Sequence, residues 1–197
     1  MELVRRADWG AAPPKGRPVP IAAPVRYLFL HHSAGPDGGA QVVRSIQDFH
    51  QRVRGWQDVG YTWLYSPGSR TFYEGRGPAI HGAHTRGYNK VGHGLCVLGN
   101  YDKAELPVHA IDDLAEWAYW HGGTWGPDQY IPHRQMGETA CPGRNIMAVL
   151  DTINDLASGR SVVQVDAEPD PDDFEMLRDA DDLASMSWWE REVFSGD

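Results

Sequence analysis

Nine histidines and two cysteines are the side chains of this 197-residue chain best suited to bind a transition metal. Zinc prefers imidazole nitrogen and thiolate sulfur, and a catalytic zinc site keeps three protein ligands and a fourth position for water. His133 and Cys141 stand eight residues apart, and the flanking Pro132 and Pro142 favour a rigid loop over a helix. This spacing is not a compact metal signature, so spacing alone does not select the ligands.

His31 directly follows a short apolar run at residues 25–30. Such a run is typical of a strand buried on both faces. A side chain at the point where a buried strand emerges can be both rigidly held and accessible, which suits a ligand or a catalytic group. Cys96 lies inside another apolar run, at residues 95–98, and we interpret it as a buried small hydrophobic residue.

The strands and the first helix that must position these side chains follow from the hydrophobic pattern. The opening segment to about Pro24 is rich in proline, glycine and alanine and is expected to be extended loop. Apolar residues recur at helical spacing over residues 42–53, and this helix should end near Gly55. The remaining predicted strands span residues 61–66 and 71–74, which should form a hairpin, and residues 95–101.

Two further helices are predicted, at residues 109–121 and 145–157. The first should place Tyr119 on its apolar face and Asp113 on its exposed side, and it should stop at Gly122. Strands and helices are therefore mixed along the chain. We predict an α/β fold with a central mixed β-sheet flanked by about three helices.

The net charge of −9 is concentrated at the C-terminal end, because residues 163–197 alone carry a net charge of −10. We predict one domain over residues 1–159, followed at 160–197 by an acidic linker with a possible short helix at 174–194. This tail is expected to be a disordered or loosely docked extension. The alternative is that Trp188, Trp189 and their neighbours dock on the body, pair chains or modulate activity.

Composition also excludes two classes of partner. The body is nearly neutral and lacks the clustered basic face that nucleic-acid binding requires. No stretch approaches the roughly 18 apolar residues of a membrane-spanning helix, so we expect no membrane insertion. The N-terminus has charge and proline where a signal peptide needs an apolar run, so synthesis in the cytoplasm without a signal peptide is expected.

Five segments, in order, resemble the type 2 N-acetylmuramoyl-L-alanine amidases, a family that includes phage amidase endolysins and peptidoglycan recognition proteins. The resemblance covers about residues 3–158, and five segments in the right order are a specific signal. The segments are Arg5 with Asp8–Pro14, Tyr27–Gly35, the hairpin region with Asp58–Trp63 and Tyr73–Gly77, His81–Thr85 with Tyr88 and Asn89, and Pro132–Gly143.

The resemblance implies a role for each matching position. His31, His133 and Cys141 match the family's three zinc ligands, and Tyr61 matches its catalytic tyrosine. Thr139 matches a catalytic position that is lysine in some members and threonine in others. Threonine carries no charge, so its contribution here would be hydrogen bonding.

Three more residues in the resembling segments have a predicted role. His32 should point away from its neighbour His31, because side chains alternate along a strand, and we interpret it as structural. His84 and Asn89 lie in the family's groove-forming loop and could contact glycan or peptide. The alternative is that these two residues only structure the loop through its Asn and Gly turn chemistry.

The implied reaction is zinc-dependent hydrolysis of the amide bond between N-acetylmuramic acid and L-alanine of the peptidoglycan stem peptide. The implied biological role is that of a phage or prophage endolysin, which would reach the cell wall after holin-type release. Two alternatives remain open: a non-catalytic peptidoglycan-binding module, and a cytoplasmic amidase that recycles muropeptides. Retention of all the ligands favours catalysis, and the recycling group typically has aspartate where this chain has Cys141.

Overall fold

A six-stranded mixed β-sheet forms the centre of the computed structural model, which describes residues 2–159. The strand order is β1-β4-β3-β5-β2-β6, with β3 and β4 antiparallel and every other neighbouring pair parallel. The strands are β1 (Glu2–Val4), β2 (Tyr27–His32), β3 (Trp63–Ser66), β4 (Thr71–Glu74), β5 (Gly92–Val97) and β6 (Tyr130–Pro132). The helices are α1 (Gly39–Arg52), α2 (Val108–Thr124), the 3-10 turn η1 (His133–Gln135), α3 (Arg144–Met147) and α4 (Leu150–Ser158).

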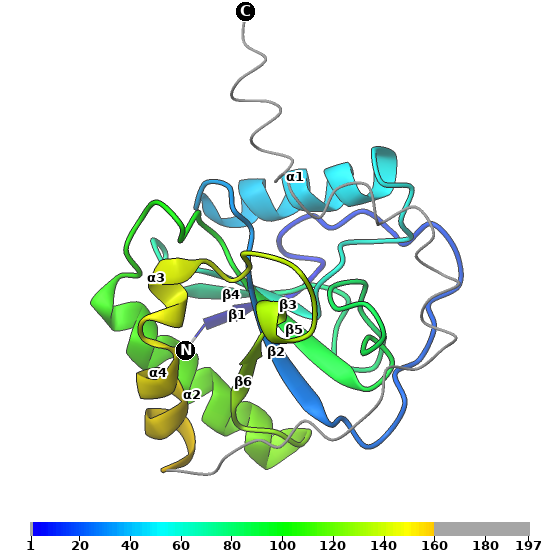
Figure 1. Cartoon of the computed structure of the whole chain (residues 1–197). Coiled ribbons are helices and arrows are strands. Elements are labelled where there is room, and N and C mark those ends of the chain that lie inside the picture. Colours follow the sequence, from blue (N-terminus) through cyan, green and yellow to red (C-terminus); the bar gives the residue numbers. More distant parts are fainter. Residues whose placement is uncertain (1, 160–197) are drawn as a thin grey trace, which may run out of the picture.

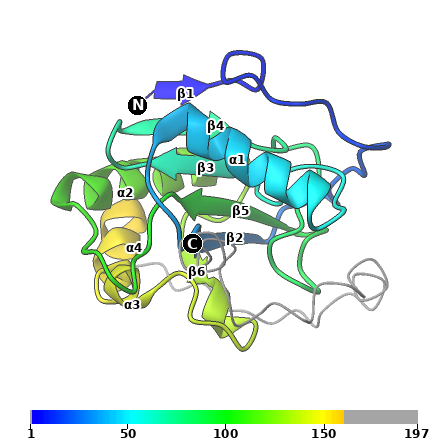
Figure 2. The same cartoon turned by 90° about the horizontal axis from the view of Figure 1, so that it is seen from above.

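The helices form layers on the two faces of this sheet (Figures 1 and 2). Helix α1 crosses one face, where it contacts β3 and β4, and α2 packs against α4 on the opposite face. Over β2 and β6, on the α1 face, Phe29 and Ile131 pack instead against Tyr88 from the loop before β5. The α1 face is therefore covered by a helix at one side and by a loop at the other.

Because side chains alternate along the strands, each strand contributes apolar side chains to the clusters on both faces of the sheet. Leu28 and Leu30 of β2 point toward α2 and α4, together with Leu95 and Val97 of β5. Cys96 lies between Leu95 and Val97 in β5, so its side chain points to the opposite face and joins the apolar cluster that α1 covers. Burial on both faces is why these parallel strands read as nearly continuous apolar runs.

The predicted fold class is confirmed, and the strand boundaries show where the sequence pattern misleads. Residues 71–74 form a strand as predicted, but the strand expected at 95–101 spans Gly92–Val97. Its first half contains two glycines and a histidine and carries no apolar signal, yet it pairs in register with β2. The opening segment, expected to be loop throughout, contributes β1, and the short β6 was not predicted.

The helix predictions need three corrections. Helix α2 continues through Gly122 and Gly123 to Thr124 instead of ending there. Its buried face is also rotated, because Tyr119 is 70% exposed whereas Asp113 is 8% exposed. Asp113 can be buried because it accepts hydrogen bonds from Tyr65 at 2.6 Å and from the Arg70 guanidinium. The helix expected at 145–157 is divided into α3 and α4.

None of the helices within residues 2–159 combines the length and the apolar character needed to cross a membrane. The predicted tail helix at 174–194, with Trp188 and Trp189, lies outside the described residues. The division into a domain at 1–159 and a linker at 160–197 therefore stays a prediction.

Candidate metal centre

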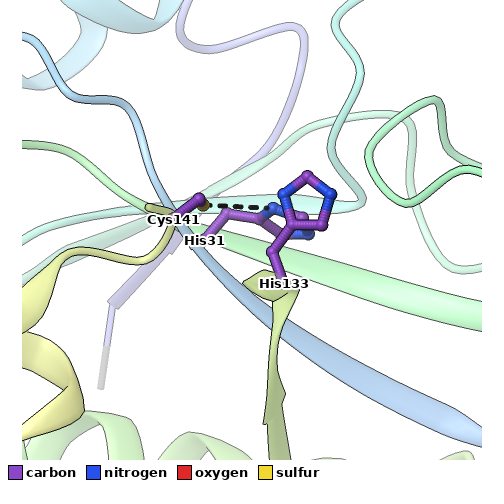
Figure 3. A group of neighbouring side chains, drawn as sticks. All are labelled: His31, His133 and Cys141. Carbon is purple, nitrogen blue, oxygen red and sulfur yellow. Dashed lines mark hydrogen bonds between the residues drawn. The ribbon is translucent and has the colours of Figure 1, made fainter. Parts of the chain in front are cut away.

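Three side chains that can bind a metal converge on the α1 face at the end of β2 (Figure 3). They are His31 near the end of β2, His133 at the start of η1, and Cys141 from the loop between η1 and α3. Their ligand atoms all lie within 4.8 Å of one another, and His31 Nδ1 is 3.6 Å from Cys141 Sγ. No other group of this kind is found within residues 2–159.

Parallel strand pairing explains why residues about a hundred positions apart meet. Leu30 of β2 is in register with Pro132 of β6, so His31 and His133 each follow a paired residue. Their rings consequently lie side by side, with centroids 4.6 Å apart. On the other side of β2, His31 is in register with Cys96 of β5. The site therefore lies where three parallel strands end or nearly end.

Burial sets the protonation of the three side chains. It lowers the pKa of His133 to about 4, with a smaller contribution from His32, and holds the pKa of His31 well below its usual 6.5. Both imidazoles are thus neutral at pH 7 and offer lone pairs. Burial raises the pKa of the Cys141 thiol to about 12, so this thiol ionises at neutral pH only beside a strong positive charge such as a metal cation.

Backbone and hydroxyl groups hold the Cys141 loop in place. The His32 amide N–H points to Cys141 Sγ at 3.4 Å, which stabilises a thiolate. The Cys141 amide donates to Thr139 Oγ1 at 3.2 Å, and the Arg134 amide donates to the Cys141 carbonyl at 2.9 Å. Thr139 thus supports the loop through a hydrogen bond, and its predicted catalytic role stays a prediction.

The donor set fits zinc. Two neutral imidazoles and one thiol are the ligand types that zinc prefers, and three protein ligands are typical of a catalytic rather than a structural site. Calcium and magnesium prefer oxygen ligands, which these three side chains do not supply. We therefore treat His31, His133 and Cys141 as the candidate zinc ligands.

Tyr61 lies beside the candidate ligands, just before β3. Its ring centroid is 5.3 Å from that of His31, and the Cys96 thiol is a polar neighbour of its hydroxyl. Burial, reinforced by the two cysteines, holds the pKa of Tyr61 well above its usual value. The phenol therefore keeps its proton at neutral pH and can donate it in a hydrogen bond. Cys96 is buried as expected, but its thiol has a polar neighbour.

His32, on the neighbouring position of β2, points away from this site. Its Nδ1 accepts the Tyr101 amide at 3.2 Å, and its Nε2 lies 4.0 Å from an Asp102 carboxylate oxygen. A side chain held in this way has a structural role, as the alternation of side chains along the strand predicts.

His84 and Asn89 are close to the site but are buried. The centroid of the His84 ring lies 5.1 Å from that of His31. The ring packs against Gly94, where an added Cβ atom would lie only 2.6 Å from it. Asn89 Oδ1 accepts the backbone amides of His84 and Thr85 at 2.8 and 3.1 Å. Asn89 thereby structures its loop, which favours the alternative weighed for it, and substrate contact by either side chain stays a prediction.

The contact of Thr85 with His31 and a second histidine pair were not predicted from the sequence. Thr85 Oγ1 lies 3.3 Å from Nε2 of His31, but nothing in the sequence pattern distinguishes this threonine from the rest of its loop. His93 and His121 lie in the core between the sheet and α2, with His93 Nδ1 2.8 Å from His121 Nε2. A helical pattern that runs past residue 121 could have indicated that His121 is buried.

Comparison with known proteins shows the family to which this chain belongs. Residues 21–144 match the model of a family described as N-acetylmuramoyl-L-alanine amidase. The mouse N-acetylmuramoyl-L-alanine amidase is 38% identical over 159 residues, which cover 75% of this chain but only 30% of the mouse protein. Drosophila melanogaster peptidoglycan-recognition protein LB is 32% identical over 160 residues, which cover 76% of this chain and 68% of that protein.

Solved structures show the same relationship. A variant of Drosophila peptidoglycan-recognition protein LB in complex with tracheal cytotoxin superposes with a TM-score of 0.70 and 30% identity, covering 76% of this chain and 93% of that one. Peptidoglycan-recognition protein LE in complex with the same ligand superposes with a TM-score of 0.71 and 28% identity, covering 76% and 92%. This chain therefore belongs to the N-acetylmuramoyl-L-alanine amidase family, and its relatives include peptidoglycan-recognition proteins.

Proposed function

We propose that this protein is a zinc-dependent amidase that hydrolyses the bond between N-acetylmuramic acid and L-alanine in peptidoglycan. The observation that carries the proposal is the convergence of His31, His133 and Cys141 beside Tyr61 in a chain of the amidase family. A family member that only binds peptidoglycan has no need of a complete set of ligands. The complete set therefore favours catalysis over binding alone.

The chemistry divides between the metal and the chain. Zinc held by these residues would polarise the amide carbonyl and make a water nucleophilic at neutral pH. The Tyr61 and His31 ring centroids are 5.3 Å apart. The protonated hydroxyl of Tyr61 can therefore donate a hydrogen bond to the developing oxyanion. Thr139 keeps Cys141 in place by accepting its amide proton.

Peptidoglycan is the proposed substrate because of what related structures bind. Two relatives of known structure are complexes with tracheal cytotoxin, a monomeric diaminopimelic acid-type peptidoglycan. Small peptidoglycan fragments with that stem peptide are therefore the first substrates to test. Lysis of a bacterial host as a phage or prophage endolysin belongs to the same proposal.

The decisive experiment is digestion of purified sacculi by the zinc-loaded protein, with mass spectrometry of the new ends. We expect free L-alanine amino termini, and their loss after chelation or in Cys141→Ala. His109→Ala is the matched control, since His109 lies outside the metal-binding group and contacts the Pro67 carbonyl instead. New reducing sugar ends without new amino termini would contradict amidase action.

The same samples separate the two alternatives. A binding module would sediment with sacculi and release nothing, whether or not zinc is present. A recycling amidase would cleave small anhydro-muropeptides much faster than intact sacculi. Preferential cleavage of sacculi would support the lytic role.

A further inference from the structure

The two nitrogens of the His31 ring have different surroundings. Nδ1 faces the Cys141 sulfur at 3.6 Å, inside the group of candidate ligands. Nε2 lies 3.3 Å from the hydroxyl oxygen of Thr85, which is not one of the candidate ligands. A neutral imidazole carries one proton, so Nδ1 has a lone pair for a metal only when the proton is on Nε2. The position of that single proton decides whether His31 can act as a ligand through Nδ1.

Thr85 is placed to fix that proton. Its side chain is as deeply buried as that of His31, each being 1% exposed, so water does not compete for the hydrogen bond. The same hydroxyl oxygen lies 3.0 Å from Nδ1 of His84. A hydroxyl can accept one hydrogen bond while donating another, so it can accept the His31 proton and donate its own to His84.

The direction of this short chain of hydrogen bonds matters. If His84 Nδ1 carried a proton and donated to Thr85, the hydroxyl would donate to His31 Nε2. The His31 proton would then lie on Nδ1, where it would block the metal-facing lone pair. A cation beside Nδ1 excludes this arrangement, and the favourable direction in turn strengthens metal binding.

The Thr85 loop is fixed by its own contacts rather than by a metal. Asn89 Oδ1 accepts the backbone amides of His84 and Thr85, and the Tyr88 amide donates to the Thr85 carbonyl at 3.1 Å. The Tyr88 ring packs edge-on against Phe29, two residues before His31 on the same face of β2. The hydroxyl is therefore held behind His31 by the fold itself, as a preorganised support for a ligand should be.

We propose that Thr85 is a positioning residue of the metal centre, whose hydroxyl accepts the Nε2 proton of His31 and so directs Nδ1 to the metal. The hydroxyl of Thr85 contacts Nε2 of His31 and Nδ1 of His84, so it would act on the metal through His31. This inference rests on the proposed function and deepens it. It also assigns Asn89 a part in the same arrangement, as the residue that holds Thr85 in place.

The test compares zinc affinity in three variants, measured by competition with a chromophoric chelator. Thr85→Val keeps the shape but removes the hydroxyl, and we expect zinc binding to weaken about 10- to 100-fold. Thr85→Ser keeps the hydroxyl and should stay within about threefold of the wild type. Thr71→Val is the matched control, because it removes another buried threonine hydroxyl, one that donates to the Ser69 carbonyl at 3.0 Å, away from the site. An unchanged affinity in Thr85→Val would overturn the inference.

A second measurement needs no variant and therefore does not depend on whether Thr85→Val folds. Long-range proton–nitrogen NMR of the zinc-loaded wild type should show His31 with metal on Nδ1 and a slowly exchanging proton on Nε2. A His31 that binds zinc through Nε2 would overturn the inference. Failure of the proposed function looks different, since the wild type would then bind no zinc or leave sacculi uncut.

Discussion

Two groups of histidines lie on opposite faces of the sheet, and their ring nitrogens have different neighbours. At the end of β2, His31 and His133 converge with the thiol of Cys141. In the core under α2, His93 Nε2 lies 3.0 Å from the Pro78 carbonyl and His121 Nδ1 lies 2.6 Å from the Pro127 carbonyl. The remaining nitrogens of the second pair face each other.

The metal centre and the structural histidine pair differ in their neighbours and not in their burial. Both groups are buried, and burial lowers the pKa of all four histidines. Burial and perturbed pKa therefore do not identify the functional group. The neighbours do, because carbonyl oxygens occupy the outer nitrogens of His93 and His121 with hydrogen bonds, whereas Nδ1 of His31 faces other metal-binding atoms. His93 is also surrounded by aromatic rings, since its ring centroid lies 4.9 Å from that of Trp63 and 6.0 Å from that of Trp125.

The largest effect should come from removing a ligand. Cys141→Ala is expected to weaken zinc binding by more than about 100-fold, because even the loss of an outer-shell partner costs 10- to 100-fold. Release of L-alanine amino termini from sacculi should fall to background. His121→Phe, in the other histidine group, should leave zinc affinity at the wild-type value. A comparable loss of zinc in both variants would erase the distinction between the two groups.

A smaller effect is expected from Tyr61→Phe, which separates catalysis from metal binding. Loss of a hydrogen-bond donor to the oxyanion should lower kcat by about 100-fold or more, while zinc affinity remains unchanged. Tyr130→Phe is the matched control, since its hydroxyl donates to the Leu114 carbonyl in the core at 3.0 Å. Wild-type turnover by Tyr61→Phe, measured on small peptidoglycan fragments, would remove Tyr61 from the proposed mechanism.

His121→Phe should act on stability instead. The substitution leaves the Pro127 carbonyl and the inner nitrogen of His93 without their partner, which should lower the free energy of unfolding by about 1–3 kcal/mol. Urea denaturation of the metal-free protein measures this value. A variant as stable as the wild type would show that the pair contributes nothing to the core beyond its volume.

The smallest effect is a difference in the pH dependence of stability. Burial lowers the pKa of His93 to about 4 and of His121 to about 3, below the value of 6.5 expected when unfolded. Below pH 6.5 the unfolded chain binds protons that the folded chain does not, so stability falls as the pH falls toward 4. His121→Phe removes one such proton-binding group. Between pH 6 and 4.5, the free energy of unfolding of this variant should therefore change with pH less steeply than that of the wild type, by about 1 kcal/mol per pH unit. Identical slopes, measured by urea denaturation across this range, would show that His121 binds its proton equally in both states.

Much of the fold and the candidate site could be predicted because the signals are local. An apolar run ending at His31 indicated β2, and the family resemblance selected His31, His133 and Cys141 from the available histidines and cysteines. The glycine-rich first half of β5 could not be predicted, because its strand conformation comes from pairing with β2. The rotated face of α2 depends in the same way on Tyr65 and Arg70, which make burial of Asp113 possible.

The sequence by itself determined the kinds of side chain available for chemistry, the alternation that separates His31 from His32, and the position of the acidic charge. The tertiary structure decided which of these side chains meet. The register of β2 with β5 and β6 brings His31 to His133 and Cys96, and only the folded loop at 84–89 places Thr85 behind His31. Hydrogen bonds between residues 54 positions apart leave no periodic trace in the sequence, so a positioning residue of this kind is found only once the chain is folded.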